Sequence, residues 1–216
     1  LHNILQSFLI EKSFGGASGL AVERLELYKI CIAQKLYAAS EHIYFDDLMF
    51  GNIVITAIAA KQFDWTEEFI NKYSEDVSPE NRDVVYGFSL ARLSFAKGRF
   101  EDALKHLNGI KTIRHIQYKI PVRNLTLMAS YELGMLTQAV YNIDSYRHFL
   151  SNNKDSLSVI RHERVVNFLK FFAKLVKYRE KDNPAEITKL AAELEETNNT
   201  IEKSGLLEKA REFILN

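Results

Sequence analysis

Paired carboxylates at a helix start can hold a divalent metal ion, and Asp46 and Asp47 are the strongest candidates for such chemistry in this chain. An Asp-Asp-x-x-Asp metal motif needs a third carboxylate at position 50, where the chain has Phe50. The sequence also offers no second acidic motif for a facing helix. Aspartates at a helix start accept hydrogen bonds from unpaired backbone N–H groups, so we expect these two to cap and charge a helix.

The histidines and the single cysteine are the other residues with the chemistry for metal binding or nucleophilic catalysis. No two of the six histidines have the i, i+4 spacing of a helical metal pair, and there is no His-Glu-x-x-His sequence. Cys31 lies between Ile30 and Ile32 in a helical pattern, which favours a buried structural thiol over a nucleophile. We therefore expect no catalytic residue, no metal site and no cofactor, and we do not expect an enzyme. The histidines are His2, His42, His106, His115, His148 and His162.

Lysines recur along one stripe of a helix expected at 157–181: Lys170, Lys174, Lys177 and Lys181. This segment carries seven basic and two acidic residues, whereas 182–216 carries four basic and eight acidic residues. Two interpretations follow: neighbouring helices with complementary charge, or a groove for nucleic acid. A nucleic-acid groove would interleave base-stacking aromatic residues with the lysines, and here the aromatic residues fall on the expected core face. We favour complementary helices.

The composition of the chain indicates a helical protein with a sizeable core. Its 216 residues are 47% hydrophobic and 12% aromatic, with only 9 Gly and 3 Pro.

The 28 basic and 28 acidic residues balance, so no overall field favours nucleic acid or an anionic membrane. A single cysteine suits a reducing cytoplasm. No apolar run approaches a membrane span, and the first twelve residues lack the basic head of a secretion signal, so we expect a cytoplasmic protein.

Apolar spacing predicts an all-α chain. Helices are expected where apolar residues recur at helical spacing, and Ser78-Pro79 is a favourable helix start because Pro at the first helical position has no N–H bond to lose. The β-branched run 52–56 lies inside a helical pattern, so we expect no strand. The expected helices are 19–40, 46–62, one from Asp64, 79–97, 100–110, 118–133, 136–151, 157–181, 184–203 and 205–215.

An internal repeat connects two of these helix pairs. The segment 91–103 aligns with 127–139 at an offset of 36 residues, so that Gly98 matches Gly134, Phe100 matches Leu136 and Ala103 matches Ala139. Glycine ends a first helix where a left-handed backbone angle is needed, and alanine lets the paired helices approach closely.

A weaker third copy is expected 35 residues upstream of the first of these two. There Phe63, Trp65 and Glu68 match Gly98, Phe100 and Ala103.

These units resemble tetratricopeptide repeats, in which a small residue and an aromatic precede a glycine, with a further aromatic and an alanine after it. The longer segment of about 25–178 is similar to a group of uncharacterised bacterial proteins, chiefly of the Bacteroidetes type. The resemblance implies one domain over 1–216, built as a right-handed solenoid of antiparallel helix hairpins at 19–181. Solenoids need terminal elements with a polar outer face, so 182–216 is expected to form capping helices; a docking helix for another chain is the alternative.

The resemblance also implies where a partner would bind. First helices of tetratricopeptide hairpins form a concave groove, and the residues expected to face it are Phe88, Arg92, Phe95, Asn124, Met128 and Tyr131. We expect a non-catalytic module or scaffold that binds a protein or peptide there, without nucleic acid or membrane. The alternative is a regulatory or oligomeric signalling region of a longer protein, because the chain begins at Leu1 rather than Met. The partner's identity and the oligomeric state stay open.

Overall fold

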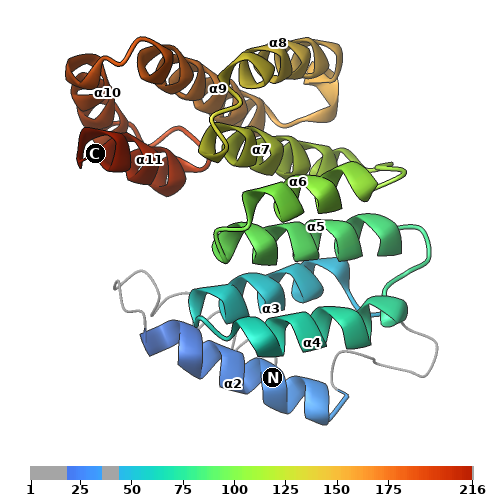
Figure 1. Cartoon of the computed structure of the whole chain (residues 1–216). Helices are drawn as coiled ribbons and strands as arrows, with labels where there is room; N and C mark the ends of the chain where they lie inside the picture. The colour runs from blue at the N-terminus through green and yellow to red at the C-terminus, as the bar shows by residue number, and fades with distance from the viewer. Residues whose placement is uncertain (1–18, 36–43, 216) are drawn as a thin grey trace. The chain divides into compact units, whose positions relative to one another are not determined.

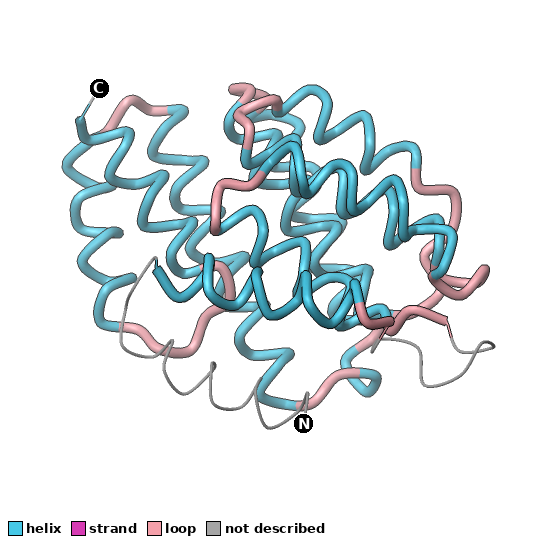
Figure 2. Tube along the Cα trace, turned by 90° about the horizontal axis from the view of Figure 1, so that it is seen from below, coloured by secondary structure: helices cyan, strands magenta, loops and turns pink. Residues whose placement is uncertain are grey.

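The structure of the chain is a computed structural model that describes residues 19–35 and 44–215 (Figure 1). These residues form helices and loops, with one isolated bridge between Phe45 and Val77 and no strand (Figure 2). The expectation of an all-α chain is therefore confirmed, and the β-branched run at 52–56 lies within a helix. The elements are α2 (Gly19–Ala33), α3 (Asp47–Ala59), α4 (Phe63–Tyr73), η1 (Ser74–Asp76), α5 (Arg82–Ala96), α6 (Phe100–Gly109), α7 (Ile116–Glu132), α8 (Leu136–Asn152), η2 (Lys154–Ser156), α9 (Val159–Glu180), α10 (Pro184–Glu196) and α11 (Lys203–Leu215).

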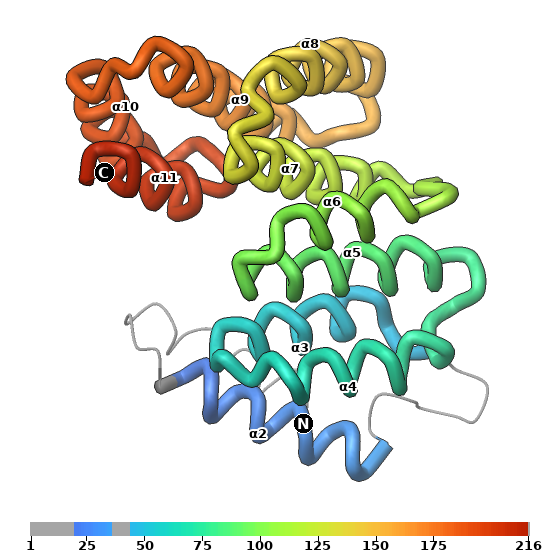
Figure 3. Tube along the Cα trace, in the orientation of Figure 1, coloured from blue at the N-terminus to red at the C-terminus, as the bar shows by residue number. Residues whose placement is uncertain are grey.

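The same backbone turn closes four helix hairpins: α3–α4, α5–α6, α7–α8 and α9–α10 (Figure 3). In the α5–α6 hairpin the Gly98 N–H donates to the Phe95 carbonyl and the Arg99 N–H donates to the Ser94 carbonyl, a Schellman pattern. The turn residue has a positive φ in every case, at Lys61, Gly98, Gly134 and Asp182. The predicted left-handed glycines at 98 and 134 are thus confirmed, and Ala103 and Ala139 are fully buried behind them.

The third repeat copy predicted from the sequence is wrong in register. Its turn residue is Lys61, 37 residues before Gly98, not Phe63. Phe63 instead begins α4 and matches Phe100, while Thr66, which is fully buried, matches Ala103. Lys61 adopts the left-handed angle although it is not a glycine. Without a glycine at this position, the sequence has no marker by which to align this copy with the other two.

A fourth copy of the turn lies at Asp182, and the sequence alignment does not find it. The Asp182 N–H donates to the Arg179 carbonyl and the Asn183 N–H donates to the Tyr178 carbonyl. Pro184 then begins α10, so α10 pairs with α9 as the second helix of a hairpin.

Three expected helix boundaries differ from the structure. The helix expected over 19–40 ends at Ala33, and residues 36–40 lie outside the described residues. The helix expected from Pro79 begins at Arg82, because 78–81 form a turn in which the Asn81 N–H donates to the Ser78 carbonyl. The helix expected over 184–203 ends at Glu196. The residues after it leave the helix and bind α9: the Asn199 carbonyl accepts from Nδ2 of Asn167 over 2.7 Å.

The chain divides into two compact units, Leu1–Val122 (unit 1) and Arg123–Asn216 (unit 2), with the division inside α7. The core of unit 1 is aromatic: the Phe45 ring packs edge-on against Phe50 and Phe69, with ring centres 5.5 and 5.9 Å apart. Within this unit α3 contacts both α4 and α5. Burial of such side chains contributes about 2 to 3 kcal/mol each and holds the hairpins together.

Unit 2 is built around α9, which contacts α8, α10 and α11. Its core residues include Phe168, Phe172 and Leu175, each fully buried. A buried ion pair ties α11 to the end of α7: Nζ of Lys209 lies 2.7 Å from Glu132 and 2.8 Å from Glu212. Burial opposes the charge of Lys209, but the two carboxylates outweigh it and raise the pKa of the ammonium group.

Gly98→Ala is expected to lower the free energy of unfolding by about 1 kcal/mol, because alanine is strained at φ +73°. Gly51→Ala is the matched control, since a Cβ at this position inside α3 meets no atom within 4 Å. It should raise the free energy of unfolding by roughly 0.5–1 kcal/mol through helix propensity. Urea denaturation followed by circular dichroism measures both, and equal shifts of the same sign would contradict the turn's role.

Lys209→Met is expected to destabilise unit 2 by roughly 3 kcal/mol, because it leaves the largely buried Glu132 carboxylate without its cation. The double variant Lys209→Met with Glu132→Leu removes both charges and should recover at least half of that loss. Thermal and urea unfolding of the two variants are compared with wild type. A double variant less stable than the single one would show that packing, not the buried charge, sets the cost.

Candidate functional site

The predicted binding residues on α5 lie partly exposed, and they contact one another or a neighbouring helix. The guanidinium carbon of Arg92 lies 4.5 Å from the centre of the Phe88 ring. The Phe95 ring packs edge-on against Phe100 of α6, with centres 5.2 Å apart. The three side chains keep some accessible surface in unit 1.

The predicted binding residues on α7 are buried within unit 2. Asn124 is 3% exposed and accepts a hydrogen bond from the Tyr146 hydroxyl over 2.9 Å. Tyr131 packs edge-on against Phe172, and its carbonyl accepts from Arg179. Met128 lies against Gly205 of α11, where an added Cβ would be only 3.1 Å from Cε. These side chains make contacts within the unit, so we do not include them in a binding surface.

A groove of about 680 Å³ lies between α8 and α9 in unit 2. Its floor is apolar, formed by Leu150 and Leu169 together with the more accessible Val166 and Ala173. Basic side chains border this floor along both helices and at η2 between them. They are Arg147, Lys154, His162, Lys170, Lys174 and Lys177, and Ser151 completes the lining.

The charges around this groove are only partly neutralised. Lys174 pairs with Glu193 of α10 over 2.6 Å, and Arg147 pairs with Asp144 over 2.9 Å. The predicted complementarity of neighbouring helices thus holds at Lys174. Within the part of the chain that the structure describes, Lys154, Lys170 and Lys177 form no ion pair, and they are exposed.

The groove owes its α8 wall to extra helical turns. The second helices α4 and α6 end 12 and 11 residues after their turn residues, whereas α8 ends 18 residues after Gly134. Arg147, Leu150 and Ser151 all lie on this extension of α8. The helix length, not only the repeat itself, therefore creates the groove.

A second hollow of about 800 Å³ adjoins the groove and shares Lys154, His162 and Val166 with it. Its lining differs in charge, since Asp155 and Glu163 now stand beside the basic residues. Val159, which is 73% exposed, adds an apolar surface at the start of α9. The two hollows form one surface that is basic toward the end of α9 and of mixed charge toward its start.

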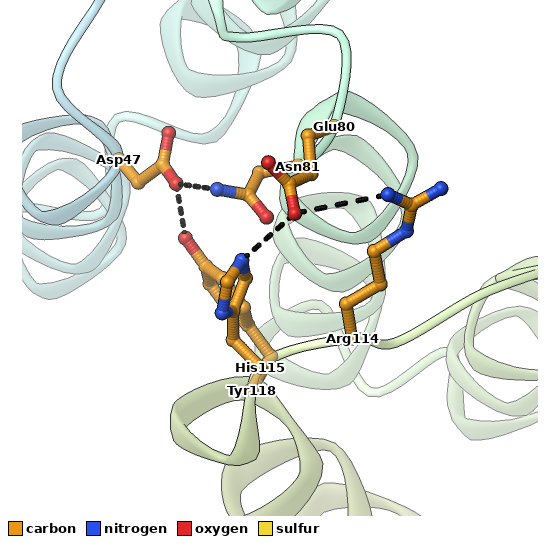
Figure 4. Close-up of polar contacts among 6 residues, drawn as sticks. All are labelled: Asp47, Glu80, Asn81, Arg114, His115 and Tyr118. Atoms are coloured by element: carbon orange, nitrogen blue, oxygen red, sulfur yellow. Dashed lines mark hydrogen bonds and ion pairs between the residues drawn. The ribbon is translucent and has the colours of Figure 1, made fainter.

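A polar cluster in unit 1 joins the start of α3, the segment before α5 and the start of α7 (Figure 4). The Tyr118 hydroxyl donates to Oδ2 of Asp47 over 2.6 Å, and Nδ2 of Asn81 donates to the same oxygen over 2.7 Å. Burial, and then the contact with Asp47, raise the pKa of Tyr118 well above its ordinary range. Two donors directed at one carboxylate oxygen make this cluster a structural link between segments.

The outer part of this cluster is exposed. Oε1 of Glu80 lies 3.2 Å from Nε2 of His115 and 3.8 Å from the Arg114 guanidinium (Figure 4). Exposed pairs of this kind contribute at most about 1 kcal/mol each. They add little to stability.

The sequence candidates for metal and thiol chemistry are Asp46, which has a structural role, and Cys31, which is not the fully buried thiol that its sequence context predicted. Oδ1 of Asp46 accepts from the Met49 N–H over 2.7 Å, which confirms the predicted helix cap. Cys31 is only partly buried, and burial raises the pKa of its thiol, which disfavours the thiolate. In the described ranges no three His, Cys, Asp or Glu side chains come together as metal ligands. Nor does any described helix have the length and apolarity to cross a bilayer.

Comparison with protein-family models, with curated proteins and with solved structures finds no match to this chain.

The lysine stripe on the α9 wall of the groove could be seen in the sequence, where it was interpreted as charge complementary to a neighbouring helix, and the α8 wall could not be seen. The lysine stripe of α9 was visible from its spacing, as was the local excess of positive charge. Arg147 and Lys154 gave no such signal, because they join the stripe only when α8 packs against α9. Tyr118 and Asp47 were likewise missed as a pair, since 71 residues separate them.

Tyr118→Phe is expected to lower the free energy of unfolding at neutral pH by about 1 to 2 kcal/mol, through loss of the hydrogen bond to Asp47. Because its folded pKa is raised, Tyr118 ionises first in the unfolded chain, so its stabilisation falls as pH rises above about 10. The free energy of unfolding of the variant should therefore fall less than that of wild type between neutral and alkaline pH, as measured by urea unfolding.

Tyr86→Phe is the control for this measurement, since its hydroxyl makes only an exposed contact of 3.2 Å with Asn71. It should change stability by less than about 0.5 kcal/mol. Equal effects of the two substitutions would contradict a structural role for the Asp47 cluster.

Proposed function

We propose that this chain is a non-catalytic interaction module that binds a peptide segment of a partner protein in the α8–α9 groove. The groove is the single observation that carries the proposal. It combines an apolar floor with exposed basic side chains that have no ion pair among the described residues. Surfaces of this composition suit peptide recognition, in which apolar side chains provide affinity and charged groups fix orientation.

The repeated hairpins support an interaction role. Four hairpins share one turn, and the first three turn residues are spaced by 37 and 36 residues. This spacing is consistent with the tetratricopeptide-like solenoid expected from the sequence, which forms part of the proposal. Repeat proteins built of stacked helix pairs commonly have an extended surface that binds a partner.

The dimensions of the groove agree with a peptide ligand. A volume of about 680 Å³ falls within the range of ligand pockets and accommodates a few side chains. Its walls are two helices, so the binding surface is held by the packed core beneath, where Leu150 and Leu169 are each 2% exposed. Such a preformed surface avoids much of the entropic cost of ordering on binding.

Ala173→Phe is the substitution that tests the proposal, because Ala173 lies on the groove floor and a phenyl ring there would fill it. A library of random peptides displayed on phage is selected against the full chain, and enriched peptides are measured by calorimetry. We expect peptides that bind wild type and lose about tenfold or more in affinity with the variant.

Ala185→Phe provides the matched control, since Ala185 is exposed on the first turn of α10, away from the groove lining. It should leave peptide affinity within about twofold of wild type. Selected peptides that bind all three proteins equally would place the binding surface elsewhere, and a library that yields no binder would overturn the proposed function.

A further inference from the structure

Resting on the proposed function, we propose that the α8–α9 groove recognises an acidic peptide: a run of carboxylates over Lys170 and Lys177, followed by one apolar side chain over Val166. The other end of the peptide is neutral or basic, because it lies beside Asp155 and Glu163. The chemistry of the occupant is thus ordered along the groove.

The sign of the ligand follows from the charges on the lining. Five Lys and Arg side chains line the groove, and no Asp or Glu is among the residues of that lining. Arg147 and Lys174 already have carboxylate partners, at 2.9 and 2.6 Å, which orient them from outside the groove. Lys170 and Lys177 have no carboxylate partner among the described residues, so an incoming carboxylate would give them one without breaking an existing pair.

The apolar position follows from what the floor exposes. Leu150 and Leu169 are almost completely covered, but Val166 is 42% exposed and belongs to both hollows. Val159, which is 73% exposed and lines the second hollow, continues this surface at the start of α9. A ligand side chain such as leucine would cover Val166 and remove apolar surface from water on both molecules.

A nucleic acid fits these features less well than a peptide. Single strands are held by aromatic side chains on which bases stack, and the described lining of the groove contains no Phe, Tyr or Trp. A phosphate backbone continuing past His162 would also meet Asp155 and Glu163. The mixed charge at that end limits the anionic stretch to the region beside Lys170 and Lys177.

The proposal is tested by fluorescence anisotropy with the full chain and three labelled peptides of equal length. One contains a leucine next to four consecutive glutamates, the second replaces those glutamates by glutamine, and the third replaces them by lysine. Two further probes are an oligothymidine with the same net charge as the acidic peptide and vesicles of phosphatidylserine with phosphatidylcholine. All are measured at about 0.1 M salt, where the screening length is about 10 Å.

We expect the acidic peptide to bind about tenfold or more tightly than its glutamine and lysine analogues. The double variant Lys170→Glu with Lys177→Glu should lose about tenfold or more in affinity for it, and Lys170→Gln with Lys177→Gln should lose less. Both positions are exposed, and circular dichroism confirms that the variants fold. The matched control, Lys72→Glu with Lys105→Glu in unit 1, makes the same charge change on exposed side chains outside the groove and should stay within about twofold of wild type.

The remaining outcomes separate this inference from the proposed function. If the glutamine or lysine analogue binds as tightly as the acidic peptide, the inference is wrong while the interaction role stands. Tighter binding of the oligothymidine or the vesicles, lost in the Lys170 and Lys177 variants, assigns the groove to that class and overturns the inference. If none of the peptides binds and display yields no other binder, both the inference and the proposed function are wrong.

Discussion

The left-handed turn at the end of each first helix is the constraint on which the hairpins depend. At Lys61, Gly98, Gly134 and Asp182 the chain adopts a positive φ, and two backbone hydrogen bonds close the helix end. Three residues then separate the two helices of every pair. A turn this short fixes where the second helix starts, and so it places a small or apolar residue five positions later in the core: Thr66, Ala103, Ala139 and Ile187, each fully buried.

Departures from the repeat, rather than the repeat itself, create the candidate site. The turn sets the hairpin, but α8 continues for 18 residues after Gly134, and α9 has 22 residues. The additional residues at the end of α8 include Arg147 and Ser151, which line the groove. The additional residues at the start of α9 include His162, which lines it from the other side. A scaffold that is uniform at its turns thus gains a distinct surface where two of its helices are longer than their counterparts.

The two turns that glycine marks could be placed from the sequence, and the other two could not, although the helices on either side of them were expected. Gly98 and Gly134 identified their turns because glycine has no steric penalty at positive φ. Lys61 and Asp182 adopt the same angle without that signature, so one copy was placed two residues out of register and another was missed. Capping by Asp46 was predictable because it is local, within three residues.

The site was predictable only where its residues share one helix. The spacing of the lysines predicts their stripe on α9. Arg147 lies beside this stripe only through tertiary packing, which cannot be predicted from periodicity. The burial of the expected binding residues was more difficult to predict. Asn124 and Tyr131 occupy positions that the tetratricopeptide resemblance assigns to a binding face, yet Tyr146 of α8 and Phe172 of α9 cover them. Contacts made by helices later in the chain decided their exposure.

The central claim is that binding occurs between α8 and α9, on a surface added to a repeated scaffold. Titration of the isotopically labelled chain with the acidic peptide, followed by amide ¹H–¹⁵N chemical shifts, tests it most directly. The account predicts that the largest shift changes lie at 147–177, with saturation at a single affinity. Largest changes on α5 around Phe88 and Arg92, or changes spread evenly over both units, would contradict it.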